Sequence, residues 1–215
     1  MNAGEPAQPG RDCPLCPRLV AFREAARQRE PAWRNAPVPS FGSLDAQMLI
    51  VGLAPGLQGA NRTGRPFTGD WAGDLLFATL AKYGFAHGVY DERLDDGLTL
   101  DDALITNAVR CAPPANKPTP EEMRTCRMFL EQTLVAMLRL RAIVALGRIA
   151  HDSVLRAHGI SLARAPFAHG AQHALGPIML FDSYHCSRYN TNTGVLTTAM
   201  FEAVFASVRA FLTPD

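Results

Sequence analysis

The chain has 215 residues, 47% of them hydrophobic and 19% charged, with a formal net charge of +1 at pH 7. This composition suits one compact domain with a buried core, and it lacks the strong basic excess that usually marks a nucleic-acid-binding domain. No stretch approaches the ~20 apolar residues of a bilayer-spanning helix, and residues 1–12 lack the apolar centre of a signal peptide. We therefore expect no membrane segment, a flexible N-terminus over residues 1–12 and a single domain over residues 13–215.

Helical and strand patterns alternate along the chain. In chain order, we predict a helix over residues 17–29, a strand over 47–52, a helix over 70–83, a strand over 103–107, a helix over 119–138, a strand over 141–146, a helix over 147–158, a strand over 177–181 and a helix over 194–212. Each strand is a short apolar run without alternation, which is typical of parallel strands buried on both faces. The pattern predicts an α/β fold, a three-layer α/β/α sandwich with a central four-stranded parallel sheet, which binds ligands beyond the carboxyl ends of its strands.

Four of the five cysteines fall into two pairs. Cys13 and Cys16 form a CxxC before the first helix, and Cys111 and Cys126 flank a proline-rich loop after the second strand. Four thiolates can hold either Zn²⁺ or an iron–sulfur cluster, and the alternative is that these thiols are buried and unligated. Cytosolic proteins rarely keep structural disulfides, so we expect a metal site formed by all four. Cys186 lies far from them in sequence and is expected to be unligated.

Basic residues surround the proline-rich loop. Lys117 lies within it, and Arg110, Arg124 and Arg127 lie close to its ends. A metal site that fixes this loop would present these cations to phosphate groups. The alternative is a solvated face whose charge is balanced by Glu121 and its neighbours.

Further motifs follow the predicted strands. The sequence reads GLAPG at residues 52–56, GANRTGRPFTGD at 59–70, NAVRC at 107–111 and HCSRYNTNTG at 185–194. With the four cysteines, these motifs resemble the uracil-DNA glycosylase superfamily over nearly the whole chain. Within it they resemble family 5, a broad-specificity bacterial and archaeal type with a [4Fe–4S] cluster.

The resemblance implies what the chain does. It implies a DNA-repair enzyme that hydrolyses the N-glycosidic bond of uracil, and of other damaged bases such as hypoxanthine, ethenocytosine or mismatched thymine, and that leaves an abasic site. It also implies that Cys13, Cys16, Cys111 and Cys126 hold a [4Fe–4S] cluster. We expect a monomer that acts on DNA and is located in the cytoplasm, at the nucleoid of a prokaryote.

Two residues depart from the patterns of the superfamily. Ala54 stands where the best-known uracil-specific family has an aspartate that positions water, and family 5 shares this absence. Cys186 stands where a proline usually follows the motif histidine, and a cysteine leaves that loop less constrained.

The motifs assign roles to the base pocket. We expect Phe67 to stack on a flipped base, Asn107 to bind the polar edge of uracil, and His185 to donate a hydrogen bond to the base carbonyl. Phe67 could instead be a core residue, and Asn107 could hold a strand-end turn. The backbone at Gly52, Ala54, Pro55 and Gly56 is expected to approach the base closely.

The remaining motif residues are expected to position the hydrolytic water or to contact DNA. Asp70 is the candidate to orient the hydrolytic water, with help from Asn61, although Asp70 could also simply cap the following helix. Residues 187–190 are expected to form a loop that enters the minor groove. The predicted DNA contacts are Ser187, Arg188, Tyr189, Asn190, Arg62, Arg65 and Lys117.

Two other functions remain open from the residues alone. One is a zinc-stabilised hydrolase of free nucleosides or nucleotides, and the other is a non-catalytic module that binds DNA lesions. Because no lysine lies near the motifs, we expect no Schiff-base lyase step, so the product is an intact strand with an abasic site.

Overall fold

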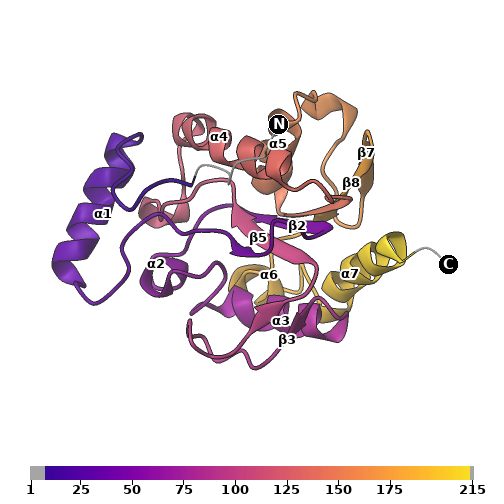
Figure 1. The fold of residues 1–215 in the computed structure, drawn as a ribbon, viewed down its shortest axis with the longest axis horizontal. Coiled ribbons are helices and arrows are strands. Elements are labelled where there is room, and N and C mark those ends of the chain that lie inside the picture. Colours follow the sequence, from indigo (N-terminus) through magenta and orange to yellow (C-terminus); the bar gives the residue numbers. More distant parts are fainter. Residues whose placement is uncertain (1–7, 214–215) are drawn as a thin grey trace.

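The computed structural model describes residues 8–213 (Figure 1). Its centre is formed by four parallel strands, which lie side by side in the order β5, β2, β6, β8. These strands are β5 (Ala103–Asn107), β2 (Met48–Gly52), β6 (Ala142–Leu146) and β8 (Ile178–Ser183). β5, β2 and β6 are buried along their whole length, as their unbroken apolar runs predict. The predicted parallel sheet is confirmed, although β8 continues beyond residue 181 to Ser183.

Two antiparallel strands at the edges make the sheet six-stranded and mixed, which corrects the predicted number of four. β1 (Phe41–Gly42) pairs with β5, and β7 (Gln172–Leu175) pairs with β8. Neither strand has an apolar run: β1 is two residues long, and the first three residues of β7 remain partly or fully exposed. A separate two-stranded ladder joins β3 (Ala86–His87) and β4 (Thr99–Leu100).

Helices cover both faces of the sheet, which confirms the three layers. Figure 1 shows α4 (Pro120–Ala136) and α5 (Arg148–Ala157) on one face, and α3 (Trp71–Lys82) and α7 (Thr198–Leu212) on the other. Because successive side chains of a strand point to opposite faces, Leu49 packs with the first pair of helices and Ile50 with the second. Thr119 begins α4 with the capping box that its spacing from Glu122 predicts.

The N-terminal helix α1 (Pro17–Arg29) lies beyond the edge of the sheet, at the left of Figure 1. Leu19 packs with Val109 and Phe129 in a small core of its own. The first seven residues of the predicted flexible N-terminus lie outside the described part of the chain. Residues 11 and 12 are held on α1, because Arg27 donates to the carbonyl of Arg11 at 3.2 Å and pairs with Asp12 at 2.7 Å.

The C-terminal segment contains two helices instead of the single predicted one. The short helix α6 (Arg188–Asn192) precedes α7, and Gly194 lies between them with φ of 72°. Each helix has its own cap: Ser187 Oγ accepts from Asn190 N at 3.4 Å, and Thr197 Oγ1 accepts from Met200 N at 3.2 Å. Residues 187–190 are therefore the start of a helix, which corrects the expected loop.

Three short elements complete the fold. They are α2 (Ala60–Thr63) and the 3-10 turns η1 (Pro114–Asn116) and η2 (Leu162–Arg164). Among residues 8–213, no helix combines the length and apolar character needed to cross a membrane.

Candidate active site

A pocket of about 360 Å³ opens at the carboxyl ends of the parallel strands. Its walls come from the segments that follow β2 and β8, the end of β5 and the start of α3, where an α/β sheet is expected to bind its ligand. The residues predicted from the sequence that line it are Ala54, Pro55, Gly56, Phe67, Asp70, Asn107, His185, Ser187 and Arg188.

The three side chains expected to recognise a base lie together in this pocket. The rings of Phe67 and His185 are nearly parallel, with an interplanar angle of 28° and centroids 5.9 Å apart. Asn107 ends β5 beside them, and its side chain lies directly over the backbone of Gly52. A Cβ atom at Gly52 would overlap Asn107 Oδ1 and would lie 2.7 Å from Phe67 Cζ. The missing side chain at Gly52 therefore allows both groups to reach the pocket.

Phe67 is held in an unusual backbone conformation by its neighbours. Its φ of 54° lies in the left-handed region, which is costly for a bulky residue unless the surroundings fix it. Tyr90 Oη donates to the carbonyl of Phe67 at 3.2 Å and accepts from Gly69 N at 3.4 Å. α3 also packs closely here, since a Cβ at Gly73 would overlap both Phe67 O and Tyr90 Oη. Tyr90 lies outside every motif, so the sequence carries no signal for this role.

Arg65 lies inside the protein, which corrects its predicted contact with DNA. Its side chain is 3% exposed and pairs with Asp96, which is 1% exposed, at 2.6 Å. The guanidinium also lies over the rings of Phe41, Phe77 and Tyr90, at 5.2 to 5.8 Å from their centroids. The hydrogen bonds from Arg65 hold the pKa of Asp96 well below its usual range. Arg65 thus supports the loop that carries Phe67.

Asp70 lies in the pocket wall and caps α3. One carboxylate oxygen accepts from Ala72 N at 3.2 Å. Oδ2 lies against the backbone of the β2–α2 segment, where a Cβ at Gly59 would come within 2.6 Å of it. Burial raises the pKa of Asp70, and the hydrogen bonds from the backbone of Ala72 and Gly73 oppose this effect. The cap is therefore observed, and a carboxylate of increased basicity faces the same cavity.

Asn61 does not reach the pocket, which corrects its predicted part in holding water. Its side chain is buried, and Nδ2 donates to Asn35 Oδ1 at 2.8 Å. Asn35 in turn donates to the carbonyl of Glu30 at 2.7 Å. The Asn61 amide therefore joins α2 to the segment that follows α1.

His185 is kept neutral by its surroundings. Burial lowers its pKa to about 4, because it removes the water that would stabilise an imidazolium. Asn190 Nδ2 donates to the carbonyl of His185 at 2.8 Å. The side chain of Asn190, which was predicted to contact DNA, is therefore turned toward the segment that carries His185. The next residue, Cys186, points into the core and is fully buried. Burial raises the pKa of its thiol, so Cys186 remains protonated.

Trp71 and Arg188 form the rim of the pocket. Arg188 lies over the Trp71 ring at 5.5 Å, and Trp71 Nε1 donates to Thr191 Oγ1 at 3.0 Å. Trp71 is 49% exposed although it is large and apolar, and Tyr189, which follows Arg188 in α6, is 74% exposed. Trp71 was not among the predicted site residues, although a tryptophan directly after the capping Asp70 is a signal that the sequence carries.

The other predicted DNA contacts lie on the surface or near the rim. Arg62 and Lys117 are exposed, and Ser187 lines the pocket. Asn116, which was not predicted as a site residue, lines the pocket and precedes Lys117 in the chain. Arg110 is 1% exposed and bonds to Ser40 and Thr106, so it cannot present its charge to phosphate as expected.

The four predicted metal ligands line one small cavity between α1 and α4. Burial raises the pKa of Cys111 to about 11 and that of Cys126 to about 12, so these would be neutral thiols without a bound cation. Arg23 lines the same cavity and is buried, and within the described residues its Nε and Nη1 have no hydrogen-bond partner. A buried cation with free donors suits a group that is anionic when four thiolates hold it.

The spacing of the sulfur atoms can be compared with that of a tetrahedral zinc site. In a tetrahedral zinc site with Zn–S bonds of about 2.3 Å, the sulfur atoms lie about 3.8 Å apart. Within residues 8–213, no three of these sulfur atoms lie within 4.8 Å of one another. The described sulfur atoms therefore do not form the close set of a single tetrahedral ion.

Comparison with known proteins identifies relatives of the whole chain. Residues 39–209 match the family described as the uracil DNA glycosylase superfamily. A type-5 uracil-DNA glycosylase of Thermus thermophilus is 47% identical over 203 residues, which cover 92% of this chain and 92% of that protein. Similar proteins of the same name come from Pyrobaculum aerophilum, at 40% identity with 93% and 88% covered, and from Mycobacterium leprae, at 44% with 92% and 90% covered.

Proposed function

The chain belongs to the uracil DNA glycosylase superfamily, and from this premise we propose that it is a DNA-repair glycosylase that hydrolyses the N-glycosidic bond of uracil in DNA. The names of relatives at 40% to 47% identity over most of the chain support this activity. The observation that carries the proposal is the pocket in which Phe67, Asn107 and His185 meet at the ends of the sheet.

The pocket suits a single base that has left the duplex. A base within the stack cannot be reached, so it must rotate out at a cost of a few kcal/mol. Stacking on Phe67 offsets part of that cost, since base–aromatic stacking contributes about 1–3 kcal/mol. Asn107 carries both a donor and an acceptor, which match the adjacent N–H and carbonyl of uracil.

His185 acts on the leaving base. Breaking the glycosidic bond places positive charge on the sugar and negative charge on the base, as in other glycoside hydrolyses. A neutral imidazole can donate one hydrogen bond to the base carbonyl as this charge develops. Its lowered pKa of about 4 keeps His185 in that neutral state at physiological pH.

Asp70 orients the water that attacks the sugar. Ala54 has no acidic group, so Asp70 is the carboxylate that faces the cavity among the described lining residues. Its raised pKa makes it a better proton acceptor than an exposed aspartate. The cap on α3 uses Oδ1 and fixes the orientation of the carboxylate.

Cys13, Cys16, Cys111 and Cys126 hold a [4Fe–4S] cluster. Their common cavity and the buried Arg23, whose Nε and Nη1 have no hydrogen-bond partner among the described residues, support this assignment. When bound, the cluster supplies a structural crosslink and not a step of the reaction. Cys111 and Cys126 bracket the segment that carries Asn116 to the pocket wall, so the crosslink positions that wall.

The enzyme is monofunctional and acts as a monomer on DNA. Of its two lysines, Lys82 pairs with Glu202 at 2.7 Å and Lys117 is exposed, and neither lines the pocket. Because the described lining residues include no lysine, no Schiff base forms there, and the product is an abasic site in an intact strand. Trp71, Arg188 and Tyr189 face the DNA at the rim, and Tyr189 fills the gap left by the base.

The same pocket accepts hypoxanthine, ethenocytosine and mismatched thymine, and the enzyme works in the cytoplasm.

The proposal is tested with an oligonucleotide that contains one uracil, followed by alkali. We expect alkali-dependent cleavage, and we expect His185→Ala to slow excision far more than it weakens binding of the same DNA. If His185→Ala reduces excision and DNA binding by the same factor, the role of His185 is wrong. Binding without cleavage would instead show a lesion-binding module, and base release from free deoxyuridine would show a nucleoside hydrolase.

A further inference from the structure

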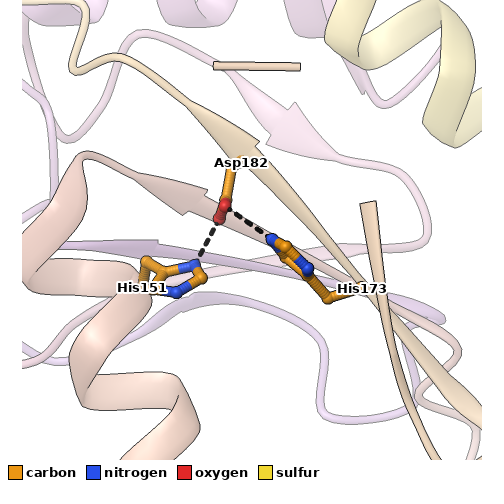
Figure 2. Close-up of side chains that lie close together, drawn as sticks. All are labelled: His151, His173 and Asp182. Carbon is orange, nitrogen blue, oxygen red and sulfur yellow. Dashed lines mark hydrogen bonds and ion pairs between the residues drawn. The ribbon is translucent and has the colours of Figure 1, made fainter. Parts of the chain in front are cut away.

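A second cluster of ligand-type side chains lies outside the base pocket, where α5 meets the edge of the sheet. Figure 2 shows His151 from α5, His173 from β7 and Asp182 from β8 pointing toward one another. The side chains of His151 and Asp182 are 1% and 0% exposed, and that of His173 is 15% exposed. None of the three takes part in the chemistry proposed above.

The hydrogen bonds of His151 determine which of its nitrogens is free. Nε2 lies 2.8 Å from the carbonyl oxygen of Ala165, which can only accept, so Nε2 carries a proton. In a neutral ring, Nδ1 then presents a lone pair to Asp182 Oδ1 at 2.7 Å. Two acceptors this close require a cation between them, either a second proton or a metal ion. A backbone carbonyl on the far nitrogen is the usual partner of a metal-binding histidine.

His173 completes a set of three donors. Its Nε2 lies 3.2 Å from Asp182 Oδ2, and one ligand atom from each of the three residues lies within 4.8 Å of the other two. Two imidazoles and one carboxylate are the ligands of many three-residue zinc sites. The partial exposure of His173 leaves a side from which an ion and a fourth ligand, water, can arrive.

We propose that His151, His173 and Asp182 form a binding site for a divalent transition-metal ion of the Zn²⁺ class. The ion joins α5 to the antiparallel pair of strands β7 and β8 at the edge of the sheet. Asp182 lies near the end of β8, three residues before His185. The ion would therefore stabilise the end of the strand that leads to this residue of the base pocket. The role is structural, and it is separate from the cysteine site.

The test measures metal bound by the purified protein in the state in which it is isolated, after equilibration with Zn²⁺ or Co²⁺. The variants are His173→Ala, at the partly exposed position, and Asp182→Asn. The matched control is His87→Ala, because His87 also contacts a carboxylate, Asp101 at 2.6 Å, but lies outside the cluster. A Cys13→Ser variant identifies any metal held by the cysteines.

We expect the wild type and His87→Ala to bind one equivalent of metal that His173→Ala loses and Cys13→Ser retains. Bound Co²⁺ should show the absorption of nitrogen and oxygen ligands without thiolate charge transfer, and Zn²⁺ should raise the melting temperature of the wild type but not of His173→Ala. Equal metal content in the wild type and His173→Ala overturns the proposal and leaves a proton as the shared cation. Because His173 is at the surface side of the cluster, this result remains decisive even if Asp182→Asn does not fold.

Discussion

Substituting Gly52 by alanine tests whether the pocket depends on the close approach of its two walls. The added Cβ would overlap Asn107 Oδ1 and would lie 2.7 Å from Phe67 Cζ. The ring must retreat by about 1 Å to reach the ~3.5–4.0 Å of an ordinary carbon contact. A misplacement of about 1 Å near the reacting groups costs about 100-fold in rate. We therefore expect a loss of about that size, although the φ of Gly52 suits alanine and the backbone need not change.

The assay is excision of uracil under single-turnover conditions, with thermal unfolding measured in parallel. Overpacking of this kind costs about 1–3 kcal/mol of stability, so rates are compared at a temperature at which the variant remains folded. The control is Gly10→Ala, because a Cβ at Gly10 meets no atom within 4 Å. A Gly52→Ala enzyme with the rate of the wild type would refute the reasoning, since Asn107 and Phe67 could then move without effect.

Two further predictions concern protonation and support of the pocket. Because burial raises the pKa of Asp70, its carboxylate becomes protonated, and loses its role, at a higher pH than an exposed aspartate would. The rate of excision should therefore fall as the pH is lowered through that raised pKa. Asp70→Asn should lower the rate and remove this acidic limb of the pH–rate profile. No limb should appear near pH 6.5, since His185 with a pKa of about 4 stays neutral there; a rate loss centred near the ordinary histidine pKa would contradict this. Tyr90→Phe removes the hydroxyl that bonds Phe67 O and Gly69 N, so we expect a loss of about 1–3 kcal/mol in urea unfolding and slower excision; unchanged stability would show that other groups hold Phe67 in place.

The parallel strands could be predicted because burial on both faces requires unbroken apolar runs. β1 and β7 could not, since β1 has two residues and β7 carries polar residues on an exposed edge. The short helix α6 could not be predicted either, since it has five residues and no apolar face that would distinguish it from the expected loop.

The motifs located the pocket but not the direction of every side chain. Asn107 ends β5, and Phe67 and His185 lie in the segments that follow β2 and β8, so their meeting could be expected from topology. Arg65 lies in the same run as Phe67, yet it turns inward because Asp96, 31 residues later, supplies a buried partner. Such pairings depend on tertiary structure, and no spacing in the sequence reveals them.

The way in which β2, β5 and β8 share the pocket has a consequence for partly folded molecules. Gly52, which lies against Asn107, and the pocket residues Asn107 and His185 are brought together only after helices have carried the chain across the sheet several times. No contiguous fragment of the chain contains a smaller version of the pocket. Uracil excision therefore requires the complete native topology, and detachment of a single strand should abolish the activity entirely.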